Sequence, residues 1–163
     1  MIRITKITAA VFIGTMGLLV FLANLLNLGS AYEFVSLVIS GAEQPYYKII
    51  GPTVTVVWLT WVALFVIMSV ELAVGILGFS GAIRMIQQRS GTSDEFDNSK
   101  THAVLAGILG MLLWYGFFIV IGEGYFQMWQ TELGLGAVAG AFRYGTVCAV
   151  LMFFISAKDR KPV

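Results

Sequence analysis

Four long apolar runs constrain what this chain can fold into more than any other feature of its sequence. They extend over about residues 7–26, 53–83, 103–121 and 137–155 of the 163 residues. A helix of roughly 20 apolar residues is long enough to cross the hydrocarbon core of a bilayer. The sequence therefore predicts an all-α membrane protein, a four-transmembrane-helix bundle that forms a single domain over residues 1–163.

The amino-acid composition limits the classes of protein to which the chain can belong. Hydrophobic residues make up 58% of the chain and charged residues 12%, whereas an ordinary soluble domain carries about a quarter charged residues. The net charge of +1 is too small for a nucleic-acid footprint. One cysteine, Cys148, excludes a disulfide within the chain, and one histidine, His102, disfavours a conventional zinc site. The sequence arranges no nucleophile with a base and no phosphate loop, so we expect neither an enzyme nor a bound cofactor.

The first apolar run follows two basic residues, Arg3 and Lys6, as the core of a secretory signal does. The run over residues 7–26 is longer than the roughly 7 to 15 apolar residues of a signal peptide. We therefore expect this segment to remain in the protein as a transmembrane helix.

The basic residues predict the orientation, because Lys and Arg accumulate in cytoplasmic segments. Those on one side of the predicted bundle are Arg3, Lys6, Arg84, Arg89, Lys100, Lys158, Arg160 and Lys161. Only Lys48 lies in a loop on the other side, while Arg143 falls inside the fourth run. Both termini and the loop over residues 84–102 are therefore expected in the cytoplasm, and segments 28–51 and 122–136 outside.

The connecting segments differ in character. Residues 89–100, RSGTSDEFDNSK, are polar and of mixed charge, which is typical of a solvated turn. The apolar residues within 28–51 favour a short amphipathic helix, on the outer surface or beneath a partner. Aromatic residues at the edges of the runs suit the membrane interface, and the expected anchors are Tyr46, Tyr47, Tyr125 and Trp129.

Small residues at helical spacing mark faces where helices can approach closely in a membrane. The fourth run carries Ala137, Ala141, Gly145 and Ala149 in one row. Comparable notches in the first and third runs are Gly14, Gly17, Gly107 and Gly110. These faces predict packing within the chain or, alternatively, docking of a helix from another subunit.

Polar residues inside the runs require a partner or a purpose, because a charge at mid-bilayer costs about 2.5 to 3.5 kcal/mol. Glu71 lies within the second run, and Arg143 lies at a similar depth in the fourth. Arg143 is expected to pair with Glu71, or to reach outward to Glu123 at the end of the third run. Asn24 is expected to cap the first helix or to bridge to another. The alternative reading makes Glu71 a proton or cation site.

Several of these residues carry a family resemblance. The pattern GEGYFQMWQ followed by AFR, over residues 122–143, resembles a bacterial family of predicted small integral membrane proteins of unknown function. Asn24, Glu71 and FDNSK at 96–100 also agree with that family. The sequence departs from it at Gly124 and in the spacer LGLGAVAG at 133–140. The resemblance implies four transmembrane helices, and for a bacterial protein the inner membrane, but it implies no activity.

These observations favour a non-catalytic accessory subunit of a larger inner-membrane complex, with a respiratory complex as one candidate. The contrasting hypothesis is a small oligomeric transporter or channel that uses Glu71 and Arg143. A third hypothesis, a quinone- or lipid-binding protein, rests only on the aromatic residues near the interface. The expected partners are membrane lipids together with other integral membrane subunits or further copies of the chain.

Overall fold

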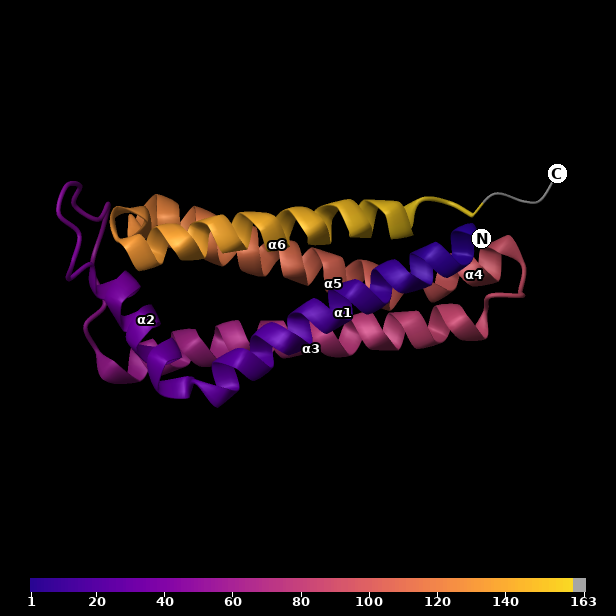
Figure 1. Ribbon diagram of the computed structural model, residues 1–163, viewed down its shortest axis with the longest axis horizontal. Coiled ribbons are helices and arrows are strands. Elements are labelled where there is room, and N and C mark those ends of the chain that lie inside the picture. Colours follow the sequence, from indigo (N-terminus) through magenta and orange to yellow (C-terminus); the bar gives the residue numbers. More distant parts are fainter. Residues whose placement is uncertain (160–163) are drawn as a thin grey trace.

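The computed structural model describes residues 1–159, which form an elongated bundle of helices (Figure 1). The helices in chain order are α1 (Ile2–Leu26), α2 (Leu28–Ser40), α3 (Val57–Gln87), α4 (Ser93–Ser99), α5 (Thr101–Met111), the π-helix η1 (Leu112–Tyr125), the 3-10 turn η2 (Met128–Gln130) and α6 (Glu132–Ser156). The part of the chain that the structure describes contains no strand.

Four helical segments are long and apolar enough to cross a membrane: α1, α3, the run over residues 93–125, and α6. The predicted four-helix membrane fold is therefore confirmed. The N-terminus of α1 and the C-terminus of α6 lie at the same end of the bundle, where Arg3 Nη2 lies 2.6 Å from Asp159 Oδ2. Which side of the membrane this end faces stays a prediction.

The helices begin and end at different residues from those predicted. The second span was expected over 53–83, but α3 begins at Val57, because residues 53–56, which follow Pro52, have no regular secondary structure and Val56 has an extended backbone. The amide of Val54 in this segment donates to the carbonyl of Ile39 at 2.8 Å. The fourth span begins at Glu132 rather than 137, because the Thr131 hydroxyl caps it by accepting from the amide of Gly134. Most of the expected external segment 122–136 is therefore helical.

The expectation of a solvated turn over residues 89–100 was wrong in part. The segment contains helix α4, which a capping box between Thr92 and Glu95 begins. Phe96 of this helix is fully buried, and the Arg3 guanidinium carbon lies 4.8 Å from the centre of its ring. One aromatic residue in a polar stretch thus fixes the segment to the bundle, which composition alone does not reveal.

The closest helix pairing joins α1 to α3 through glycines. A Cβ atom built on Gly78 would lie 2.5 Å from the Cα atom of Gly14, and one on Gly17 would lie 2.8 Å from the amide nitrogen of Gly75. Real Cβ atoms do not approach so closely, so the two backbones meet only because side chains are missing there. Such contacts hold membrane helices together where no hydrophobic force between helices operates.

The end of the bundle that carries most of the basic residues, here called the basic end, is closed by polar contacts. Lys6 and Lys100 both donate to the carbonyl of Ala157, which follows the last turn of α6. Cations at a helix C-terminus satisfy its free carbonyls and oppose the negative end of its dipole. Both lysine side chains are buried, so they join α1 and α5 to the end of α6.

Candidate functional site

The site is centred on Glu71, which lies midway along α3 and is 1% exposed. Asn24, from the last turns of α1, places its Nδ2 atom 2.8 Å from Glu71 Oε1 and 2.9 Å from Oε2. Asn24 therefore bridges two helices, which is one of the two roles expected from the sequence. A buried carboxyl group without such a donor would lose its hydration uncompensated.

Arg143 lies elsewhere, on the exposed surface of α6. Its Nε atom donates to the carbonyl of Ala139, one turn earlier in the same helix, at 3.2 Å. Within residues 1–159 the ion pairs are Arg3–Asp159 and Lys100–Asp97. The expected ion pair of Arg143 with Glu71 or Glu123 is therefore absent from the described chain, because Arg143 points away from the bundle.

Glu123 lies in the last turn of η1, at the end of the bundle opposite the basic end, and is half-buried. This position agrees with a rim residue that water can reach. The expected polar network of four residues thus reduces, within the described chain, to the pair of Asn24 and Glu71.

The small-residue row of α6 faces the bundle. Ala141 and Gly145 are buried, while Ala137 and Ala149 lie at the margins of the contact. A Cβ atom on Gly145 would lie 2.5 Å from the ring of Tyr115 in η1. The other notches also pack internally: a Cβ atom on Gly107 would lie 2.4 Å from Met152, and one on Gly110 would lie 2.5 Å from Cys148 Sγ.

A different face of α6 is open. It consists of residues spaced by three or four positions, namely Gly136, Gly140, Arg143, Val147 and Val150. A Cβ atom on Gly136 or on Gly140 would meet no atom within 4 Å. We call this stripe the open face of α6. It pairs two backbone notches with an exposed arginine.

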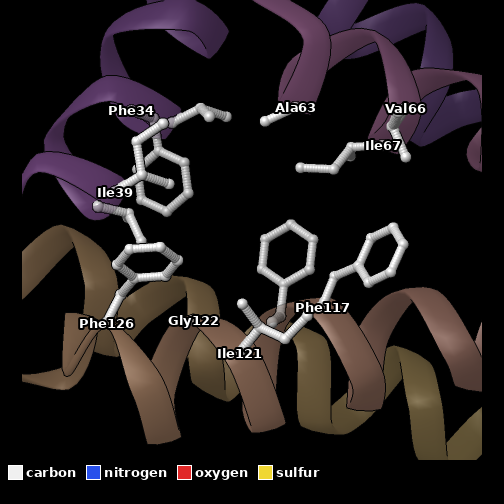
Figure 2. Close-up of a pocket in the computed structure, with 12 residues that line it drawn as sticks. Phe34, Ile39, Ala63, Val66, Ile67, Phe117, Ile121, Gly122 and Phe126 are labelled. Atoms are coloured by element: carbon white, nitrogen blue, oxygen red, sulfur yellow. The ribbon is translucent and has the colours of Figure 1, made fainter. Parts of the chain in front are cut away.

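Two cavities lie between the helices. The first, here the Glu71 cavity, has a volume of about 240 Å³, and its wall includes Asn24, Glu71 and Trp114. The second, here the rim cavity, has a volume of about 270 Å³ and lies between α2, α3 and η1. Figure 2 shows the rim cavity with apolar side chains turned into it from both sides. The two cavities share the wall residues Phe34, Val35, Ile67 and Phe118.

The π-helix η1 supplies one wall of both cavities. Its wider turns are shown by the bond from the amide of Phe126 to the carbonyl of Ile121, five residues earlier, at 2.9 Å. π-helices are rare and usually short, and they occur often at functional sites. In this chain η1 extends over 14 residues and directs Trp114, Phe117 and Phe118 toward the cavities.

A serine and a histidine meet near the basic end, but their geometry does not suit nucleophilic catalysis. Arg84 Nη1 lies 2.7 Å from His102 Nε2, and Ser80 Oγ lies 2.8 Å from His102 Nδ1. Arginine can only donate, so Nε2 is the acceptor and Nδ1 carries the proton. The histidine therefore donates to Ser80 and has no lone pair with which to activate it.

Comparison with known families identifies the family of the chain. Residues 2–158 match the model of a family described as "Predicted small integral membrane protein (DUF2165)". The chain belongs to this family. No curated protein and no solved structure matches the chain. Family membership agrees with the four apolar helices and with a multi-pass membrane protein, which contacts lipids, and it assigns no activity.

The expected interface anchors of this family member lie together at the end opposite the basic end. The rings of Tyr47 and Trp129 are 5.7 Å apart, and the Tyr125 hydroxyl donates to the carbonyl of Pro52 at 3.3 Å. Tyr46 is 80% exposed. These aromatics therefore join the segment before α3 to the turn before α6.

Sequence reasoning missed the residue that holds this end most directly. Gln130 Oε1 accepts from the amides of Tyr46 and Tyr47, at 2.8 and 2.7 Å, and its Nε2 donates to the carbonyl of Tyr47 at 2.8 Å. Gln44 likewise donates to the carbonyl of Phe126. One feature of the sequence could have indicated this role: glutamines stand beside an apolar run, where amide side chains need hydrogen-bond partners.

Proposed function

We propose that the protein is a non-catalytic accessory subunit of a larger bacterial inner-membrane complex. The observation that supports the proposal is the exposed position of Arg143 on the open face of α6. Counting along α6, Arg143 lies roughly 16 Å from the residue that begins the helix and roughly 20 Å from the one that ends it. The Cα atom of Arg143 is therefore near the middle of the span, and its guanidinium reaches back toward Ala139, one turn nearer Glu132.

An arginine at this depth requires acceptors. The structure gives its guanidinium one hydrogen bond, to a carbonyl of its own helix. Snorkelling toward the nearer surface lowers the cost of its charge by bringing its N–H donors toward interfacial water, and any donor that stays within hydrocarbon requires a protein acceptor. A carboxylate on a neighbouring transmembrane helix would accept from them in the bidentate geometry that arginine favours.

The backbone beside Arg143 suits such a helix. Gly136 and Gly140 repeat at the spacing that lets two transmembrane helices approach closely. A Cβ atom on either would meet no atom of the described chain within 4 Å, and Gly140 also borders the Glu71 cavity. The other small-residue rows are used within the bundle. The open face of α6 is therefore the surface on which we place the partner.

A second copy of the chain fits this surface poorly. In a two-fold dimer the same face meets itself, so the two Arg143 side chains would lie together and repel. The acidic residue of comparable depth, Glu71, is buried and already bonded to Asn24. The proposed partner is therefore a transmembrane helix of a different protein that carries an aspartate or glutamate at mid-membrane depth.

Photo-crosslinking in native membranes tests the proposal. A photoreactive residue replaces Val147, which is 43% exposed on the open face, and the matched control replaces Leu19, which is 61% exposed on α1. We expect position 147, but not position 19, to crosslink to a transmembrane helix that contains an acidic residue. The crosslink should disappear in Arg143→Leu and persist in Arg143→Lys.

The partner's residue provides the second half of the test. Changing its acidic residue to leucine should remove the crosslink as Arg143→Leu does, because either change breaks the same pair. Crosslinks from position 147 that reach only lipid or a second copy of the chain would overturn the proposal. Equal labelling from positions 147 and 19 would overturn it too.

A further inference from the structure

The Glu71 cavity and the rim cavity adjoin, because they share four wall residues. We call their combined space the aromatic cleft. Val66 and Ile121, which line its rim part, are 45% and 44% exposed. In a membrane these residues face hydrocarbon, so the cleft is accessible from the bilayer rather than from water.

The walls of the Glu71 cavity are suited to a flat ring. Four aromatic side chains line it: Phe34, Trp114, Phe118 and Tyr144. Aromatic groups prefer offset or edge-to-face contacts with another ring, which add to the gain from burial. A cavity of about 150 Å³ accepts benzene, so a cavity of about 240 Å³ has room for a substituted ring.

The rim cavity differs in chemistry from the Glu71 cavity. The residues around it are all apolar apart from the backbone, and they include Ile39, Ala63, Phe117 and Phe126 (Figure 2). A hydrocarbon chain would contact such a lining on several sides. A polar group would find no side-chain hydrogen-bond partner there. The cleft therefore has one polar end and one apolar arm.

The polar end is formed by Glu71 and Asn24 in the middle of the bundle. Each carboxyl oxygen of Glu71 accepts one hydrogen bond, from the same amide nitrogen, and a carboxyl oxygen has capacity for a second. A hydroxyl group can both donate and accept. It can therefore donate to a carboxyl oxygen of Glu71 or accept from the amide of Asn24. A charged head group would pay the cost of mid-membrane burial, which an uncharged one avoids.

We propose that the aromatic cleft binds an uncharged hydroxyaromatic amphiphile, a phenol or hydroquinone ring with a hydrocarbon tail. The ring lies among the aromatic walls with its hydroxyl on Glu71 and Asn24, and the tail lies in the rim cavity. This inference and the proposed partner rest on different observations. The open face of α6 shares no residue with the rim cavity and shares Gly140 alone with the wall of the Glu71 cavity.

Three matched probes test the ligand chemistry on the purified full-length protein in phosphatidylcholine nanodiscs. The probe 4-dodecylphenol has the ring, the hydroxyl and the tail; dodecylbenzene lacks the hydroxyl, and 1-dodecanol lacks the ring. Binding is followed by tryptophan emission, and a Trp114→Phe variant assigns the signal to the cleft. We expect saturable binding of 4-dodecylphenol. Dodecylbenzene forms one hydrogen bond fewer and should bind about two- to tenfold more weakly.

Two variants with controls locate the site. Glu71→Gln keeps the shape of the side chain and should weaken 4-dodecylphenol roughly two- to tenfold, while Glu123→Gln at the rim should not change binding. Ala63→Phe places a ring in the rim cavity and should weaken 4-dodecylphenol by about tenfold or more. The control Val62→Phe adds the same ring to a neighbouring residue that is 50% exposed, and should leave binding unchanged.

Equal and unsaturable responses to all three probes would show simple partitioning into lipid and would overturn the proposal. Binding of 4-dodecylphenol that survives Ala63→Phe would overturn it as well. If Glu71→Gln does not fold, the comparison of probes and the Ala63 and Val62 variants still decide the question. The two proposals fail separately. Absence of probe binding together with an intact crosslink from position 147 would overturn this inference and leave the proposed function standing.

Discussion

Asn24 on α1 and Glu71 on α3 form a buried polar bridge, with the Asn24 amide nitrogen 2.8 and 2.9 Å from the two carboxyl oxygens. The bridge lies on the same two helices that meet through Gly14 and Gly78 nearer the basic end. The contact of Gly14 with Gly78 requires residues without a side chain. The contact of Asn24 with Glu71 requires a hydrogen-bond donor opposite an acceptor. Together they fix both the distance and the register of α1 along α3.

Removal of the bridge should destabilise the protein. Asn24→Ala leaves the Glu71 carboxyl buried without its donor, a change that costs about 1 to 3 kcal/mol. The matched control is Asn27→Ala, since Asn27 is exposed and its side chain donates to the carbonyl of Ala23 in its own helix. Reversible unfolding in mixed detergent and SDS micelles measures both variants. Equal stabilities would show that the bridge contributes nothing.

The glycine contact between α1 and α3 should tolerate no side chain. Gly78→Leu would drive a side chain into the Gly14 backbone, where even a Cβ atom would lie 2.5 Å away. We expect a loss of at least about 2 kcal/mol, as for severe overpacking. Gly29→Ala is the control, since a Cβ atom there would meet nothing within 4 Å. The same unfolding assay applies, and a Gly78→Leu protein as stable as this control would contradict the packing.

Two glycines of α6 should respond differently to the same substitution. Gly145→Leu should destabilise the isolated protein by about 1 to 3 kcal/mol, because its side chain meets the ring of Tyr115. Gly140→Leu should leave the isolated protein within about 0.5 kcal/mol of the wild type, as for substitutions that disturb no contact. Gly140→Leu should instead weaken the crosslink from position 147. Thermal unfolding and crosslinking together measure this contrast.

The contacts that hold α4 and the chain after α6 at the basic end, here called the clamp, should depend on Arg3. Its side chain donates to Asp159 and to the carbonyls of Arg89 and Gly91, at 2.6 to 2.9 Å, and covers the ring of Phe96. Arg3→Gln should therefore loosen α4 and the chain after α6, at a cost of about 1 to 3 kcal/mol.

Hydrogen exchange of residues 90–99 is the measurement for this clamp. Faster exchange is expected in Arg3→Gln, and no change is expected in Lys158→Gln, which removes an exposed charge from the same end. Unchanged exchange in Arg3→Gln would show that α4 is held by Phe96 alone.

The opposite end should depend on Gln130. Gln130→Ala removes an acceptor shared by the amides of Tyr46 and Tyr47, so the segment before α3 loses these hydrogen bonds to η2. We expect faster limited proteolysis within residues 42–52. The control is Gln87→Ala at the exposed end of α3. Equal cleavage of the two variants would mean that the aromatic contacts suffice.

The sequence predicted much of the fold and little of the site. Apolar length alone placed four spans, but it misplaced their ends, because the capping groups at Thr92 and Thr131 lie in polar stretches outside the runs. It singled out Glu71, Asn24 and Arg143 as polar residues in apolar surroundings. It could not pair them, because depth along a helix says nothing about the direction in which a side chain points.

The sequence by itself therefore determined that the chain is a bundle of four membrane-length helices, because the hydrophobic length of each run leaves few alternatives. The tertiary structure decided which contacts those helices make. Rotation of α6 about its axis buries Gly145 and exposes Arg143, and η1 lines the cavity beside Glu71. Such rotations depend on packing that involves many residues at once, so no local pattern of residues reveals them.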